Sequence, residues 1–294
     1  CYLLTQVARM GSILYLLALP MNALLGWDIK MIIAVTSVAI IAYSMLGGLK
    51  AVIWTEAIQG FILIGGAIAC LCVLMFKMPG GPAQVFQIAI TDQKFSLGSF
   101  GSSLTESTFW VCLIYGIFIN LQNYGIDQNY VQRYLTAKSD KQAKFSALFG
   151  GYLFIPVCGG FFMIGMAWYA YYKTFPELLP AGVEEDAVFP YFIVHALPTG
   201  LTGLLIASIF AAGMSTVATS ITSSATIILT DYYARYINKR PTEKQSVRAL
   251  YVSNVLIGII GIFVALAFLN VESALDAWWA LSSIFSGGML GLFL

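Results

Sequence analysis

The chain has 294 residues, of which 59% are hydrophobic and 10% are charged, and its formal net charge is +1. A soluble globular domain carries about 25% charged residues, so the charge here is too sparse for a water-exposed surface. A net charge near zero supplies no basic field for nucleic acid, and the composition also disfavours a disordered chain and a soluble enzyme. The composition is that of an integral membrane protein.

Eight continuously apolar runs are long enough to be membrane spans or parts of them. A bilayer core takes about 20 residues of helix. The runs lack the alternation of barrel strands, so an all-α membrane protein with about eight spans is expected. In chain order the runs are 2–26, 31–47, 51–76, 108–124, 145–172, 201–229, 247–269 and 278–294.

Lysine and arginine residues set the expected orientation, because cytoplasmic loops carry an excess of both. If successive spans cross the membrane in alternating directions, ten of these basic residues fall on one side and four on the other. The side with ten is therefore predicted to be cytoplasmic. The external side includes the segment 77–107 and a predicted short helix at 187–198. The predicted cytoplasmic residues are Lys50, Arg133, Lys138, Lys141, Lys144, Arg235, Lys239, Arg240, Lys244 and Arg248, and the external ones are Lys30, Lys77, Lys94 and Lys173.

The two ends of the chain favour a longer parent protein. The sequence begins at Cys1 without an initiator methionine and ends at Leu294 inside an apolar run. We therefore expect residues 1–294 to form a single membrane domain that is truncated at both ends.

The densest group of hydroxyl residues lies in the sixth run, at 211–224. Ala212, Ser215, Thr216 and Thr219 recur at spacings of three and four, so on a helix they share one face. Hydroxyl and backbone carbonyl oxygens are the ligands that a small hard cation such as Na⁺ prefers. The alternative is helix packing, because small hydroxylated residues let membrane helices approach closely and bond back to the preceding turn.

Two ionisable residues fall inside the apolar runs. Arg9 in a span is costly unless it faces a cavity or a partner, and its planar fork suits a carboxylate. Alternatively, Arg9 snorkels to the headgroups. Glu56 could ligate a cation, carry a proton or form a structural hydrogen bond. His195, the only histidine, is expected to be a packed or solvated interfacial residue rather than a proton relay.

The end of the fourth run, at 120–128, is unusually polar and includes Gln122 and Asp127. Either the helix breaks here and lines a cavity, or an ordinary helix end runs into a cytoplasmic loop. The sequence contains no Walker-type phosphate loop, nucleophile elbow or metal-ligand spacing. We therefore expect that the chain is not an enzyme.

Three motifs in this order resemble the sodium:solute symporter family: YSMLGGLKAVIWTEAIQ at 43–59, DQNYVQRYL at 127–135 and IFAAGMST at 209–216. The resemblance covers the whole chain and implies a LeuT-type fold, with two inverted repeats and a solute site between them at the midplane. It also implies that residues 1–76 are the end of the first repeat and that residues 107–294 form the second.

The resemblance implies specific ion ligands. The main sodium site would take the Ala212 carbonyl and the Ser215 and Thr216 hydroxyls, with further ligands from a helix that precedes this chain. Some members hold a second sodium with an aspartate and two hydroxyls at the positions of Glu56, Ala218 and Thr219. Because this chain departs at Glu56 and Ala218, only Glu56 and Thr219 remain as candidates for a second site.

The solute is also suggested by resemblance. Arg9, in the setting QVAR at 6–9, is similar to the bacterial sodium/sialic acid symporters, where an arginine holds the substrate carboxylate. This implies sodium-coupled secondary symport of a carboxylated sugar such as sialic acid, with Arg9, Gln122 and Asp127 as candidate solute-binding residues. The alternatives are a symporter of a neutral sugar such as glucose or galactose, and a transporter-like sensor domain.

The expected partners are the solute, Na⁺ and the lipid bilayer, and nucleic acid is not expected. The expected location is the inner (plasma) membrane, with multiple spans. The sequence leaves the oligomeric state open, and a monomer is compatible with it.

Overall fold

The computed structural model describes residues 1–180, 182–183, 185–271 and 273–292, without the side chains of residues 46–52, 55, 185, 286 and 287. The predicted cytoplasmic charge of Lys50 lies outside the described side chains. The described secondary structure is entirely helical. In chain order the helices are α1 (Tyr2–Leu25), α2 (Ile29–Lys77), α3 (Gly81–Thr91), α4 (Phe109–Gly125), α5 (Gln128–Leu135), α6 (Asp140–Thr174), η1 (Pro176–Leu178), α7 (Glu185–Ala196), α8 (Thr199–Ile227), η2 (Ile228–Ile237), α9 (Glu243–Ala267), η3 (Phe268–Asn270) and α10 (Ala274–Gly291).

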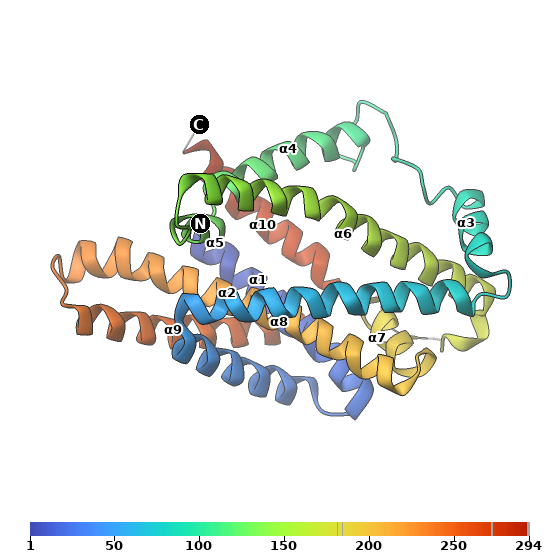
Figure 1. Cartoon of the computed structure of the whole chain (residues 1–294), viewed down its shortest axis with the longest axis horizontal. Helices are drawn as coiled ribbons and strands as arrows, with labels where there is room; N and C mark the ends of the chain where they lie inside the picture. Colours follow the sequence, from blue (N-terminus) through green and yellow to red (C-terminus); the bar gives the residue numbers. More distant parts are fainter. Residues whose placement is uncertain (181, 184, 272, 293–294) are drawn as a thin grey trace. The chain divides into compact units, whose positions relative to one another are not determined.

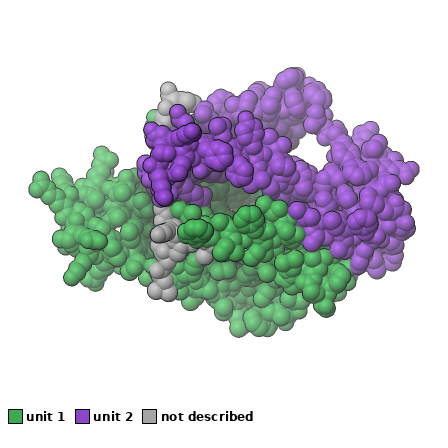
Figure 2. Space-filling model, viewed as in Figure 1, with its two compact units in different colours: residues 1–66, 181–292, 294 green, residues 67–180, 293 purple. Residues whose placement is uncertain are grey.

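The chain divides into two compact units, which Figure 2 shows in different colours. Unit 1 comprises residues 1–66 and 181–292, so it holds α1, the larger part of α2, and α7 to α10. Unit 2 comprises residues 67–180 and holds the end of α2 together with α3, α4, α5 and α6.

In unit 1, α1 packs against α7, α8, α9 and α10. Membrane helices gain little from hydrophobicity in lipid, so close contact depends on small residues. A Cβ added at Gly213 of α8 would meet the Leu17 side chain of α1, and one at Gly261 of α9 would lie 2.7 Å from Met10 Cε. These glycines hold α8 and α9 close to α1 around a common buried core. That core contains Met10, Leu14, Ala18, Ile32, Ile33, Ile40, Val217, Ala218, Ile221, Ile257 and Ala265.

Five of the described helices are long and apolar enough to cross a membrane, or six if α4 and α5 count as one bent span. The predicted runs 31–47 and 51–76 both fall within the element α2, in which Glu56–Lys77 is a candidate span and Ile29–Met45 a shorter apolar helix. Figure 1 shows the ribbon of α2 turning back on itself, so its two parts run in opposite directions.

The predicted loop 77–107 contains the helix α3, which the sequence analysis missed. Pro82 stands in the first turn of α3, where proline costs no hydrogen bond. Val85 and Ala89, one turn apart, are buried, and α3 packs on α6. The predicted external helix at 187–198 is present as α7, displaced by two residues at each end.

Candidate sodium and solute sites

The predicted main sodium site lies on one face of α8. Thr216 Oγ1 donates a hydrogen bond to the Ala212 carbonyl at 2.9 Å, so a hydroxyl and a carbonyl oxygen lie together. The Ser215 and Thr216 side chains are half-buried and remain accessible. These three neutral oxygens suit a hard cation, which needs about six ligands and therefore others besides these. The Thr216 bond also occurs in ordinary helix packing, so both interpretations of the sequence fit this geometry.

The opposite face of α8 fixes the position of this site. Val217 and Ala218 are buried in the core of unit 1, and the bare backbone of Gly213 lies against Leu17 of α1. Because one face is held by packing, the other face keeps its hydroxyls directed away from this core.

Glu56 of α2 and Thr219 of α8 lie together, although 163 residues separate them in the chain. Thr219 Oγ1 donates a hydrogen bond to Glu56 Oε1. Ala218, beside Thr219, is fully buried and offers no side-chain oxygen. The structure therefore joins the two remaining candidates for a second sodium site, through a direct bond between their side chains.

A second contact between α2 and α8 was not predicted from the sequence. Ser208 Oγ lies 3.0 Å from the Ile62 carbonyl and 2.7 Å from the Leu204 carbonyl. A Cβ added at Gly66 would collide with Ser208. The signal in the sequence was a glycine pair in an apolar run, since small residues mark close helix crossings. It could not indicate which helix is the partner.

Arg9 faces a neighbouring helix rather than the ends of α1. Its guanidinium carbon lies 5.7 Å from the centroid of the Trp278 ring of α10, within the range of a cation–π interaction. Arg9 is half-buried, and it makes no ion pair within the described residues. This arrangement favours the interpretation in which Arg9 faces a partner over the one in which it snorkels to the headgroups.

Gln122 and Asp127 lie in unit 2, where α4 ends and α5 begins. The two helices meet at a bend of 41°, so the fourth span is broken at this polar segment. The Gln122 carbonyl accepts hydrogen bonds from the Ile126 and Asp127 backbone, and Asp127 Oδ1 caps α5 by accepting from Asn129 N at 2.7 Å. Asp127 thus has a structural role, and solute binding by either residue stays a prediction.

His195 is exposed, stacks on Tyr191 with ring centroids 4.0 Å apart, and contacts the Tyr191 carbonyl through Nδ1 at 3.0 Å. This agrees with the expected interfacial packing.

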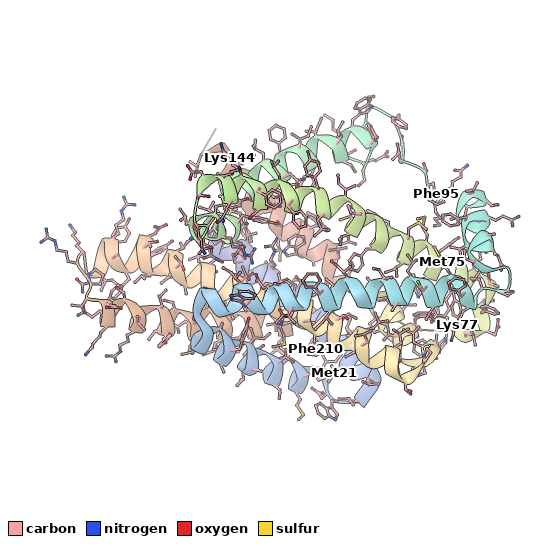
Figure 3. All side chains as sticks on the ribbon, in the orientation of Figure 1. Met21, Met75, Lys77, Phe95, Lys144 and Phe210 are labelled. Carbon is pink, nitrogen blue, oxygen red and sulfur yellow. The ribbon has the colours of Figure 1, made fainter. Side chains whose placement is uncertain are left out.

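A polar cluster joins α3 to α6 in unit 2. Lys173 Nζ forms an ion pair with Asp92, and Tyr169 OH donates a hydrogen bond to Asp92 Oδ2 at 3.0 Å. The Lys173 hydrogen bond is the main reason that the pKa of Asp92 is lowered from its usual value. Asp92 and Lys173 were both assigned to the external side. Figure 3 shows Lys77 and Lys144 toward opposite ends of unit 2, as the predicted orientation requires.

Comparisons with known proteins agree along the whole chain. The sodium:solute symporter family matches residues 1–293. The sodium/sialic acid symporter SiaT of Proteus mirabilis is 34% identical over 299 residues, covering 100% of this chain and 60% of SiaT. NanT of Aliivibrio fischeri, also a sodium/sialic acid symporter, is 33% identical over 297 residues, covering 100% of this chain and 58% of NanT. The chain therefore spans about 60% of the length of these relatives.

A more distant relative and a solved structure extend the comparison. The sodium-coupled monocarboxylate transporter 2 of Bos taurus is 30% identical, covering 99% of this chain and 48% of that protein. A Na⁺-coupled sialic acid symporter, solved substrate-bound and outward-open with a novel Na⁺ site, superposes with a TM-score of 0.91 at 34% identity. The superposition covers 99% of this chain and 61% of the solved chain. The fold is therefore the LeuT-like fold of an all-α membrane transporter, and the chain belongs to the sodium:solute symporter family.

Proposed function

We propose that this chain is the membrane core of a sodium-coupled symporter for a carboxylated solute, of which sialic acid is the first candidate. The observation that carries the proposal is the position of Arg9, a half-buried cation held over Trp278 inside an apolar helix. A buried charge is retained where it binds a partner of opposite charge. The relatives named above carry sialic acids or monocarboxylates, and all of these solutes bear a carboxylate.

The proposed mechanism couples two binding events. Na⁺ binds to the Ala212 carbonyl and the Ser215 and Thr216 hydroxyls, together with ligands from elsewhere in the full-length protein. The solute carboxylate pairs with Arg9 in a bidentate geometry. Sodium then raises solute affinity by the same factor by which solute raises sodium affinity, and the sodium gradient drives the solute inward by alternating access.

Further parts of the proposal rest on the family and on composition. The protein is a multi-pass transporter of the inner (plasma) membrane rather than an enzyme, and it acts as a single domain whose repeats meet between residues 76 and 107. Gln122 and Asp127 line the solute site, and Glu56 with Thr219 forms a weak second cation site or replaces it by their direct bond. A monomer is compatible with this arrangement.

Arg9→Ala in the full-length protein tests the proposed solute class. Thermal-shift titrations in detergent would compare sialic acid with glucose and galactose, each with and without Na⁺. We expect Arg9→Ala to abolish the sodium-dependent shift that sialic acid causes, because the carboxylate loses its counter-charge. The matched control is Arg248→Ala, which removes an exposed arginine from α9 and should leave the shift unchanged.

A neutral-sugar symporter predicts a different result. In that case glucose or galactose stabilises the protein in sodium, and Arg9→Ala leaves this stabilisation intact. That outcome would refute the proposed anionic solute while leaving the family assignment untouched.

A further inference from the structure

Four polar side chains are buried between α1, α8 and α9 with oxygen atoms that have no hydrogen-bond partner among the described residues. They are Gln6 (1% exposed), Ser220 (1%), Ser224 (0%) and Asn254 (6%). The unpaired atoms are Gln6 Oε1, Asn254 Oδ1 and the two serine Oγ atoms. Most buried polar atoms in folded proteins are paired, so four such atoms in one bundle require an explanation.

Helix register places these four residues in one layer. A Cβ added at Gly258 of α9 would meet Ile41 of α2 first and lie 3.9 Å from Ile221 of α8, and one at Gly261 would lie 2.7 Å from Met10 of α1, so Ile221 and Met10 mark neighbouring levels of the bundle. Met10 of α1 lies against Gly261 of α9, and Gly11 lies against Val264. Because the residue numbers rise together along the two helices, α1 and α9 run parallel.

The direction of α8 completes the register. Leu17 of α1 contacts Gly213, whereas Met10 shares a core with Ile221, so α8 runs opposite to α1. One turn toward the start of α1 from Met10, Ile221 and Gly258 lie Gln6 on α1, Ser224 on α8 and Asn254 on α9, respectively. Ser220 borders the same level. We call these four residues the buried polar layer.

The two serines of the layer differ from the other hydroxyl residues around them. Thr216, Thr222 and Thr226 each donate to the carbonyl four residues earlier, at 2.8–2.9 Å. Ser223 donates to the Ser220 carbonyl at 3.2 Å. Such back-bonding is the default for hydroxyl residues in membrane helices. Because Ser220 and Ser224 make no bond of this kind in the described chain, their hydroxyls are free for a partner inside the bundle.

The four atoms match the bonding capacity of water. A water molecule donates two hydrogen bonds and accepts two. The layer offers two amide oxygens, which accept, and two hydroxyls, which can donate. All four side chains are neutral, so a neutral ligand leaves no charge uncompensated. Since the helices already bury these atoms, a partner must be enclosed with them.

We propose that α1, α8 and α9 enclose an ordered water site held by Gln6, Asn254, Ser220 and Ser224. Buried water of this kind bridges polar groups that cannot reach each other and is costly to remove. Ser220 and Ser224 lie one and two helical turns beyond the proposed sodium ligand Thr216 on α8. The water site would be a structural element of the α1–α8–α9 contact in the full-length protein.

A density map of the full-length protein that resolves ordered waters tests this proposal. Maps would be recorded in sodium buffer and in choline buffer. We expect a peak within hydrogen-bond distance of Gln6 Oε1 and Asn254 Oδ1 in both buffers. Direct bonds between the four side chains with no density between them would overturn the proposal, and so would a peak that is present only in sodium.

Radiolytic hydroxyl labelling provides a second, mutational test. Enclosed water should cause labelling of Met10 and Ile221 in the wild-type protein, although both side chains are buried. The labelling should be lost when Gln6→Leu and Asn254→Leu are combined. It should persist in Ser223→Ala, the matched control, whose hydroxyl is buried on the same helix but already bonded. Absence of labelling in the wild-type protein contradicts the proposal even if the double variant fails to fold.

Discussion

The hydrogen bond between Glu56 and Thr219 gives a prediction that can be measured as a coupling energy. The perturbation is a double-mutant cycle of Glu56→Gln and Thr219→Val in the full-length protein. Thr219 is buried and Glu56 is half-buried, and the bond joins two helices. A hydrogen bond to a charged group contributes about 1.5–3 kcal/mol in soluble proteins. Interhelical bonds in membranes average about 0.6 kcal/mol, with a maximum of about 1.7 kcal/mol.

We expect a coupling free energy of about 1 kcal/mol, between these two ranges, because the Glu56 side chain is only half-buried. Equilibrium unfolding in mixed micelles without sodium measures it. The matched control is Thr222→Val, because the Thr222 hydroxyl bonds only the Ala218 carbonyl of its own helix and should show no coupling to Glu56. If Thr219→Val couples to Glu56→Gln no more strongly than Thr222→Val does, the bond does not tie α2 to α8, and the reasoning is refuted.

Three further predictions concern other contacts. Trp278→Leu removes the aromatic ring beneath Arg9, so the arginine loses the cation–π contact that orients it. The affinity for a carboxylated solute, measured by titration, should then weaken about two- to fivefold. An unchanged affinity would show that the ring has no role in orienting Arg9. Gly66→Ala inserts a methyl group where α2 crosses α8 and should lower the free energy of unfolding by about 1–3 kcal/mol in the same assay. Gly65→Ala, at the neighbouring position with open space around it, should leave the free energy of unfolding unchanged. Equal effects of the two variants would contradict a close crossing of α2 and α8. Because the pKa of Asp92 is lowered in the folded state, its ion pair with Lys173 stabilises above its unfolded pKa of about 3.8 and loses this effect as pH falls through the folded pKa. Asp92→Asn should therefore lower the thermal midpoint at neutral pH and converge with the wild type as pH falls through the folded pKa of Asp92. A constant difference at all pH values would exclude this ion pair as the cause.

The sequence predicted what depends on local pattern. Continuous apolar runs identified the spans, and the spacing of Ala212, Ser215 and Thr216 placed three oxygens on one face of α8. The α3 helix was missed because its 11 residues are too few for a membrane run, although Val85 and Ala89 carried a helical spacing. The second and third runs were predicted as separate spans, and the ribbon of α2 reverses direction between them (Figure 1).

Partners across the bundle could not be predicted. The ring beneath Arg9 is contributed by α10, and the hydroxyl bonded to Glu56 by α8, each more than 150 residues away. Periodicity identifies a face of a helix but does not identify the helix that covers it. The buried polar layer was missed for the same reason, since Ser220 and Ser224 differ from their back-bonded neighbours only in the folded structure.

Solute uptake driven by a sodium gradient tests the central claim most directly. The full-length protein would be reconstituted in proteoliposomes, and uptake of labelled sialic acid would be followed with an inward sodium gradient and with potassium in its place. We predict concentrative uptake in sodium, little in potassium, and loss of the sodium dependence in Thr216→Val, with Thr222→Val as the control. Uptake that is equal with and without the sodium gradient would contradict a sodium-coupled symporter.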